Sequence, residues 1–278
     1  MTFHESQSRF ASVAGRSSRR DLFRLAGAAA AGAACARLSA AEPSPAATTA
    51  RVPTLHRYDS YGWLRGFNII PSWGARIEQA WWEYHPGRFR EEVAMARKVH
   101  ANCIRLWIEF TAWMADPERI EKHFFDAVAA LDAAGIKVMP CLFNRWHDNR
   151  WDYGGTYTED LLRSDWGPKL DYVRRLVKPL ARDPRVLVWD LCNEPQAFNT
   201  TDPVNAKEYQ FLAAAAAAVR ESGAQQPITV GTMIGENIAT YAPLCDVLNC
   251  HPYCWTRPEL AKLIDSFNAL RQRFHKPM

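Results

Sequence analysis

Between Tyr61 and Phe274, short apolar runs alternate with longer stretches in which apolar residues recur every three or four positions. A continuous apolar run of this kind is typical of a strand buried on both faces, and the longer period is typical of an amphipathic helix. The pattern predicts strands over 63–70, 102–110, 136–143, 186–192, 228–233 and 246–251. It predicts helices over 88–100, 117–134, 158–181, 204–222 and 257–274, with room for one or two helical turns between 233 and 246.

Buried strands joined by helical crossovers predict a parallel sheet covered by helices, in the α/β class. A doubly wound sheet normally carries a Gly-rich phosphate loop after its first strand, but the segment after the first predicted strand, IPSWGARIEQAWW, lacks that motif. A (β/α)8 TIM barrel instead gathers polar and aromatic residues at the C-terminal ends of its strands. Such residues follow every predicted strand, and the barrel is therefore favoured. They are Asn68, Trp73, Glu109, Trp113, Asn144, Trp146, His147, Asn193, Glu194, Glu236, Asn237, His251, Tyr253 and Trp255.

The number of predicted units is smaller than a complete barrel requires. About six strand and helix units are predicted over 59–278, whereas the closed fold has eight. An open six-stranded barrel would expose strand edges and core. Two interpretations follow: either residues 59–278 are a C-terminally incomplete barrel, truncated before its seventh strand, or the fold is not a barrel.

The first fifty residues have a different character. Arg19 and Arg20 precede Leu22, Phe23 and Arg24, and an Ala- and Gly-rich run and small residues follow. This order resembles a twin-arginine export signal over 1–41, and we expect the mature chain to be periplasmic or extracellular. An Ala-rich amphipathic helix behind a basic tail is the alternative. The apolar run is too short and too rich in Ala for a stable membrane span, and residues 42–58 are typical of a flexible lead-in.

Composition and charge narrow the function classes. The chain has 278 residues, of which 48% are hydrophobic and 23% charged, as in a soluble globular protein. The net charge of +4 comes largely from the first fifty residues, so the remainder has no basic stripe and a nucleic-acid partner is not expected. The seven Cys include no Cys-x-x-Cys pair, so no metal or other cofactor is predicted. A disulfide among Cys245, Cys250 and Cys254 stays open, as does the oligomeric state.

The run VLVWDLCNEP ends in an amide, a carboxyl group and a proline, Asn193 to Pro195. In a barrel, Asn193 and Glu194 would lie at the C-terminal end of the strand, facing the mouth where ligands bind. Pro195 lacks an amide hydrogen and ends the ladder. Apolar and aromatic walls would solvate the carboxyl group of Glu194 poorly and raise its pKa toward the range of a general acid. The competing interpretation is a structural carboxylate that caps the next segment.

An apolar strand followed by Asn-Glu-Pro resembles the fourth-strand signature of clan A glycoside hydrolases. The chain from 61 to 278 resembles glycoside hydrolase family 5, the cellulase family, at three further motifs. Arg65-Gly66-Phe67-Asn68 is similar to the first-strand motif of that family, Arg105 to its second-strand arginine, and His251-Pro252-Tyr253 to its sixth-strand His-x-Tyr. The third-strand His of the family aligns with either Asn144 or His147.

The resemblance implies a retaining double displacement on a β-linked polysaccharide or oligosaccharide substrate. Glu194 would be the acid/base, Asn193 would bind the sugar 2-hydroxyl, and His251 and Tyr253 would organise the nucleophile. The nucleophile itself is expected beyond Met278, and Glu109 and Glu236 are expected to have structural or substrate-binding roles. Further residues expected to bind carbohydrate are Arg105, Asn144, Trp73, Trp146, His147 and Trp255. The alternative function is a non-catalytic carbohydrate-binding barrel or an inactive truncated remnant.

Overall fold

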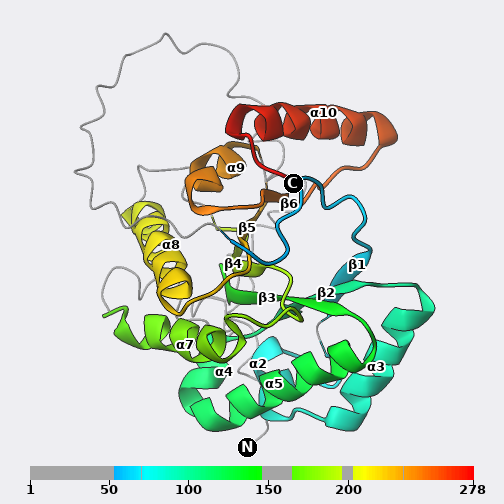
Figure 1. Cartoon of the computed structure of the whole chain (residues 1–278), viewed down its shortest axis with the longest axis vertical. Helices are drawn as coiled ribbons and strands as arrows, with labels where there is room; N and C mark the ends of the chain where they lie inside the picture. Colours follow the sequence, from blue (N-terminus) through cyan, green and yellow to red (C-terminus); the bar gives the residue numbers. More distant parts are fainter. Residues whose placement is uncertain (1–52, 70, 146–164, 196–202, 234) are drawn as a thin grey trace, which may run out of the picture. The chain divides into compact units, whose positions relative to one another are not determined.

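The computed structural model describes residues 53–69, 71–145, 165–195, 203–233 and 235–278, and within these ranges the side chains of 204, 235 and 236 are outside the description. Six strands form one parallel sheet in which each strand pairs with the next one along the chain (Figure 1). The strands are β1 (Gly66–Ile69), β2 (Cys103–Trp107), β3 (Lys137–Asn144), β4 (Trp189–Asn193), β5 (Ile228–Thr232) and β6 (Asn249–Cys250).

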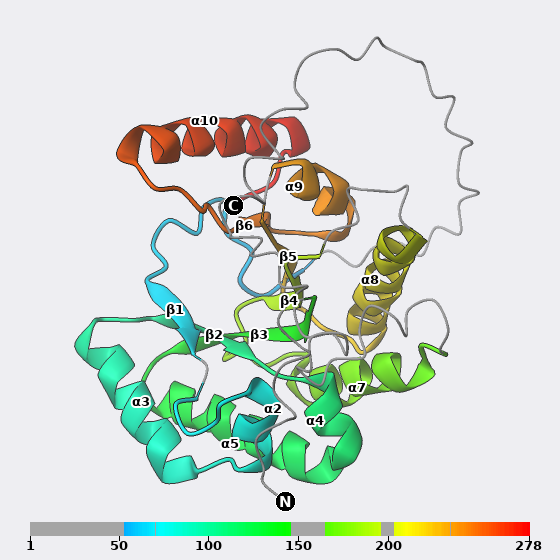
Figure 2. The ribbon, with the colours of Figure 1, turned by 180° about the vertical axis from the view of Figure 1, so that it is seen from behind.

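Helices connect the strands and follow one another around the sheet in chain order (Figures 1 and 2). The longer ones are α3 (Pro86–Lys98), α5 (Pro117–Ala133), α7 (Gly167–Val177), α8 (Pro203–Glu221), α9 (Gly235–Tyr241) and α10 (Arg257–Phe274). Shorter ones are α2 (Ile77–Trp82), α4 (Phe110–Ala115) and the 3-10 turns η2 (Lys178–Leu180) and η3 (Ala242–Leu244). In a doubly wound sheet the strand order reverses at one point. Here the order never reverses within the described sheet, and the predicted barrel-type α/β fold, present as six strand and helix units, is confirmed.

The ends of some strands and helices differ from the predicted ones, where two elements follow each other without Gly, Pro or other turn residues between them. The predicted strand over 102–110 ends at Trp107, because Phe110 already begins α4. The apolar run continues from strand into helix, and alternation alone does not separate the two. The predicted strand over 186–192 begins at Trp189, although Val186 still forms an isolated bridge with Val138 of β3. Of the predicted helix over 158–181, the part up to residue 164 lies outside the described residues, and α7 passes at Lys178 into η2, which contains Pro179.

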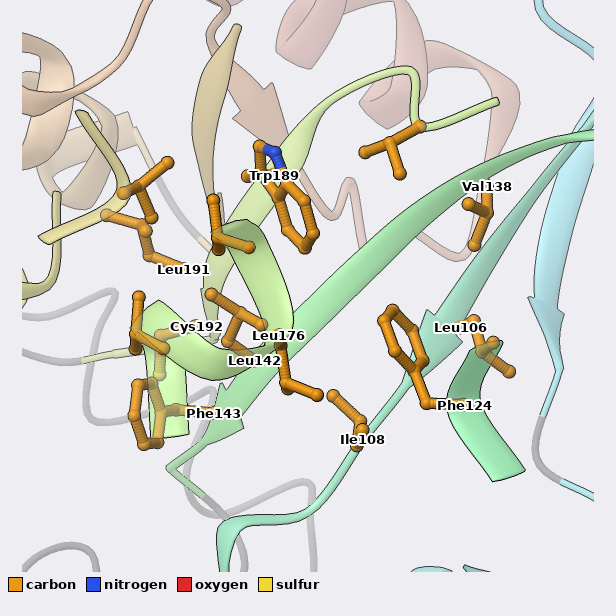
Figure 3. Packing of buried hydrophobic residues seen from close by; sticks show 14 of the residues in the cluster. Leu106, Ile108, Phe124, Val138, Leu142, Phe143, Leu176, Trp189, Leu191 and Cys192 are labelled. Atoms are coloured by element: carbon orange, nitrogen blue, oxygen red, sulfur yellow. The ribbon is translucent and has the colours of Figure 1, made fainter. Parts of the chain in front are cut away.

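The main core lies between the strands and the helices that cover them. Leu106, Leu142 and Leu191 come from three adjacent strands and are fully buried. Phe124 of α5 and Leu176 of α7 pack in the same cluster (Figure 3). Burial of an aliphatic or aromatic side chain contributes about 1.5–3 kcal/mol, so this layer holds the helices on the outer side of the sheet.

A second, smaller apolar cluster contains Cys103, Val188 and Val247. Cys103 and Arg105 stand two residues apart on β2 and therefore share a face of the sheet. The inner face is thus apolar toward the N-terminal ends of the strands and polar toward their C-terminal ends. This division places the site described below.

Residues 53–58 belong to the segment expected to be a flexible lead-in. The backbone amides of Thr54 and Leu55 both donate to the carbonyl oxygen of Gln225 at 2.9 Å. The ring Nε2 of His56 lies 2.8 Å from the carbonyl oxygen of Pro184. These contacts attach the segment to the chain on either side of α8. Among the helices that the structure describes, none has the length and apolar character needed to cross a membrane.

Candidate active site

Arg105 is the centre of the polar inner face. Its Nε donates to Asp190 Oδ2 at 2.7 Å, and its Nη2 lies 2.6 Å from the same oxygen. Its Nη1 donates to Asn68 Oδ1 at 3.1 Å and to Asn193 Oδ1 at 3.2 Å, and Nη2 also contacts Cys141 Sγ at 3.2 Å. All five N–H donors of the guanidinium are therefore engaged by protein atoms. In the structure, Arg105 joins β1, β2, β3 and β4.

Burial lowers the pKa of Arg105, but the Asp190 carboxylate and the neighbouring Cys141 and Cys192 together raise it by more, so the net change is upward. Burial likewise raises the pKa of the Cys141 thiol well above its usual range, against the opposing effect of Arg105. The guanidinium is thus permanently charged and the thiol neutral. Cys141 acts here as a weak hydrogen-bonding partner and not as a nucleophile.

An irregularity in β4 brings Asp190 and Asn193 to the same partner. Residues three apart on a regular strand point to opposite faces of the sheet. The pairing of β4 with β5 shifts register between Asp190 and Asn193, which allows both side chains to reach Arg105. The amide Nδ2 of Asn193 then donates to Asn144 Oδ1 at 3.1 Å. The predicted site residues Arg105, Asn144 and Asn193 therefore form one connected network.

Glu194 follows β4 directly and is 6% exposed. Its Oε1 accepts a hydrogen bond from Tyr253 Oη at 2.7 Å and lies 2.6 Å from Nδ1 of His251. The predicted residues Glu194, His251 and Tyr253 are therefore in direct contact. The carboxyl group is thus mostly buried and is held in one orientation by the tyrosine hydroxyl and the imidazole ring.

Gly231 of β5 leaves the space that this arrangement needs. A Cβ at this position would lie 2.8 Å from Arg105 Nη2 and 3.0 Å from His251 Nε2. The amide of Gly231 donates to Asp190 Oδ1 at 3.0 Å, and its carbonyl oxygen accepts from the amide of Glu194 at 2.7 Å. The residue thus connects both halves of the site through its backbone.

Two aromatic side chains that follow β6 are exposed. Tyr253 is 60% exposed and Trp255 is 87% exposed, so each presents a ring face to solvent. Trp107, which the sequence did not single out, donates from Nε1 to Asn68 Oδ1 at 3.2 Å, with the Arg105 guanidinium 5.3 Å from its ring centre. Trp73 instead donates to the carbonyl oxygen of Ala80 at 3.0 Å and packs partly buried against α2. The hydrogen bond to Asn68 and the stacked guanidinium therefore join Trp107 to the polar network, whereas the indole N–H of Trp73 bonds to α2.

Some predicted residues cannot be placed. Trp146 and His147 lie outside the described residues, and so does the side chain of Glu236. Glu109 is buried and precedes α4 as its N-cap residue. Among the residues that the structure describes, no group of three or more His, Cys, Asp or Glu side chains could hold a metal ion, and the six cysteines are free thiols.

Asp190 is the main site residue that sequence reasoning missed. It is fully buried within an otherwise apolar strand, and a buried charge requires a partner. Arg105 has the same character within CIRLW on β2. The presence of one acid and one base in two buried strands was a signal that they could pair.

Comparison with known proteins agrees with this geometry. The model of the cellulase family, glycosyl hydrolase family 5, matches residues 75–259, which is more than half of the chain and includes Glu194 and His251. No curated protein sequence matches the chain significantly.

Several solved structures share the fold. A GH5_18 protein of Streptomyces cattleya, solved in complex with GlcNAc, is 15% identical with a TM-score of 0.55, and the alignment covers 76% of this chain and 53% of that one. An endo-β-1,4-mannanase of Thermotoga petrophila is 13% identical with a TM-score of 0.55, covering 77% and 58%. A β-glucanase of Saccharophagus degradans in complex with cellotetraose is 16% identical with a TM-score of 0.52, covering 73% and 62%. The chain thus spans little more than half the length of these structures.

Proposed function

Because the chain belongs to glycosyl hydrolase family 5, the cellulase family, we propose that it carries the acid/base half of a retaining hydrolase of β-linked glycans. The observation that supports this most directly is the position of Glu194. Its carboxyl group is buried at the C-terminal ends of the strands, beside Asn193, and is held by His251 and Tyr253. A general acid must be held in a fixed orientation and partly removed from water, and this environment meets both requirements.

In the proposed reaction, Glu194 protonates the glycosidic oxygen as the bond to the sugar breaks. A second carboxylate attacks the anomeric carbon from the opposite face, and Glu194 then removes a proton from the water that releases the covalent intermediate. A retaining enzyme needs the two carboxyl groups about 5–5.5 Å apart. We propose that the nucleophile lies on a strand after β6, beyond residue 278 in this numbering. Asn193 would hold the 2-hydroxyl of the reacting sugar.

His251 and Tyr253 were expected to organise the nucleophile. Their contacts in the structure are with Glu194 Oε1. We propose that they orient the acid/base, and that contact with the nucleophile is an additional role of the same two side chains. Both donors would remain near the reacting centre in either case, because Glu194 and the nucleophile must face each other across the scissile bond.

The substrate class follows from the rim and from the relatives. Exposed ring faces such as that of Trp255 suit stacking against the flat, weakly polar face of a pyranose. The related structures are named as a β-glucanase, bound to cellotetraose, and an endo-β-1,4-mannanase. We propose a neutral β-1,4-linked glycan, and hydrolysis of β-glucan, mannan and xylan in parallel would identify which.

The proposal is tested with Glu194→Gln in the full-length protein. The amide cannot donate an acidic proton, so turnover of an unactivated oligosaccharide should fall on the order of 10²-fold or more. Glu91→Gln is the matched control, because Glu91 lies exposed on α3. A Glu194→Gln protein with turnover within a few-fold of the parent would contradict the assigned role.

A second function is favoured by the exposure of Trp255. A ring that is 87% exposed could bind glycan without catalysis, as in a carbohydrate-binding barrel. In that case the full-length protein would bind oligosaccharide in calorimetry without hydrolysing it. Trp255→Ala would weaken binding. The parent and Glu194→Gln would both leave the oligosaccharide intact after long incubation.

We also propose export through a twin-arginine signal in residues 1–41, which lie outside the described part of the chain. Replacing both Arg19 and Arg20 with Lys should retain the precursor inside the cell, because the paired arginines are the feature that marks this signal. Fractionation followed by detection of the processed chain would measure it. Equal export of the parent and the double variant would refute the proposal.

A further inference from the structure

Glu194 has a backbone conformation that L-residues seldom adopt. Its φ angle is +53°, in the left-handed region. A non-glycine residue stays there when surrounding contacts hold it, and such residues gather at functional sites. The direction of the Glu194 side chain therefore depends on the contacts that fix the backbone before and after it.

Three hydrogen bonds hold the backbone around Glu194, two at the peptide group that joins Asn193 to Glu194 and one at the peptide group that follows Pro195. The carbonyl oxygen of Asn193 accepts from the amide of Arg145 at 3.2 Å, and the amide of Glu194 donates to the carbonyl oxygen of Gly231 at 2.7 Å. The carbonyl oxygen of Pro195 accepts from the side-chain Nδ2 of Asn237 at 2.7 Å. The first two are bonds between backbone groups, and the third is made by a side chain.

The third bond comes from the side chain of Asn237. It lies on α9, directly after β5, and its side chain is fully buried. Among the described residues its Oδ1 has no hydrogen-bond partner, and its Nδ2 donates to Pro195. The reverse orientation would set two acceptor oxygens against each other, so the donor must face Pro195. A buried amide held by one bond has its main structural effect at that bond.

We propose that Asn237 is a positioning residue that sets the orientation of the Glu194 carboxyl group by holding the carbonyl of Pro195, the residue that follows Glu194. This inference rests on the proposed acid/base role of Glu194. Loss of the bond would free the Pro195 carbonyl. Because the proline ring fixes φ of Pro195, the movement would pass to the Glu194–Pro195 peptide group and move the Glu194 carboxyl group away from His251 and Tyr253. Proton transfer to a leaving group depends on alignment at this scale.

The test compares substrates that do and do not need a proton donor. Asn237→Ala and Asn237→Ser would be prepared in the full-length protein, with Asn268→Ala as the matched control, because Asn268 lies exposed on α10. For an unactivated β-glycan oligosaccharide, kcat/KM of both Asn237 variants should fall by roughly 10- to 100-fold. For the 2,4-dinitrophenyl β-glycoside, whose leaving group needs no protonation, kcat/KM should stay within about threefold of the parent.

A purely structural role would lower kcat/KM for both substrates in parallel, and that result would overturn the inference. Unchanged kcat/KM for the oligosaccharide in both Asn237 variants would overturn it as well. Failure of the proposed function has a different signature, in which the parent is inactive or Glu194→Gln retains full activity. In that event the ring nitrogen resonances of His251 report directly on the contact between His251 and Glu194. They should shift in Asn237→Ala and not in Asn268→Ala, and an unshifted His251 ring in Asn237→Ala would overturn the inference.

Discussion

The Nη2 atom of Arg105 lies 2.6 Å from Oδ2 of Asp190, and both side chains are almost completely buried inside the sheet. The same aspartate accepts the amide of Gly231 through its other oxygen, at 3.0 Å. The pair therefore links β2, β4 and β5 at the level just below Glu194. Loss of this ion pair should lower the stability of the sheet and change the geometry of the site.

Asp190→Asn should destabilise the protein strongly. Removal of one partner leaves the guanidinium buried and uncompensated, which typically costs about 3–5 kcal/mol. Urea denaturation gives the free energy of unfolding. Glu221→Gln breaks the Arg174–Glu221 ion pair, whose side chains are half exposed, and should change the same quantity by less than about 1 kcal/mol. Equal effects of the two substitutions would contradict the importance of the buried pair.

Tyr253→Phe removes the hydroxyl that donates to Glu194 Oε1 and keeps the ring. A hydrogen bond to a charged group contributes about 1.5–3 kcal/mol, so kcat/KM of the full-length enzyme should fall about tenfold or more. Tyr58→Phe is the control, because Tyr58 is a partly exposed tyrosine whose hydroxyl contacts His56 and not the site. If Tyr253→Phe leaves kcat/KM at the parent value, the hydroxyl does not support Glu194.

Gly231→Ala should displace the side chains of Arg105 and His251. The added methyl group would approach Arg105 Nη2 at 2.8 Å and His251 Nε2 at 3.0 Å, closer than ordinary contact allows. Such overpacking costs about 1–3 kcal/mol of stability. Displacement of His251 should also lower kcat/KM by roughly 10²-fold. At Gly62 the nearest atom to a new Cβ is Ser60 Oγ at 3.4 Å, and Gly62→Ala should therefore match the parent in both measurements. Parent-like kinetics of Gly231→Ala would show that the space is not needed.

Asp183 should contribute to acid sensitivity. Hydrogen bonds from the Arg185 side chain lower the pKa of Asp183 below its ordinary value of 3.8, although burial opposes them. A folded-state pKa below the unfolded one adds stability above the unfolded pKa, and that stability is lost as the pH falls through the folded value. Asp183→Asn should therefore lower the urea midpoint at neutral pH, and its difference from the parent should shrink below pH 3.8. Exposed Asp171 provides the control, and a constant difference across this range would exclude the linkage.

The sequence predicted the strand and helix order well because buried strands and amphipathic helices differ in period. It also located Glu194, since an acid and a proline that end an apolar run mark a strand end. The short helices α2 and α4 were missed. Each has six residues, and in α4 the apolar run of β2 continues into the helix without a break.

The hydrogen-bond network around Arg105 could not be predicted from the alternation of apolar and polar residues. Regular alternation puts Asp190 and Asn193 on opposite faces of β4, and only the register shift between them lets both reach Arg105. The left-handed φ of Glu194 and the bond from Asn237 to Pro195 also depend on contacts between segments about forty residues apart. Such contacts follow from strand register, which local sequence does not specify.

The full engagement of Arg105 has a consequence for sugar charge. A guanidinium with free donors would clamp the carboxylate of a uronic acid in two parallel bonds. Here each N–H group already contacts Asp190, Asn68, Asn193 or Cys141, so Arg105 has no free donor for the carboxylate of an acidic polymer. The arginine at the centre of the polar inner face therefore gives no preference for pectin-like or alginate-like chains over uncharged ones.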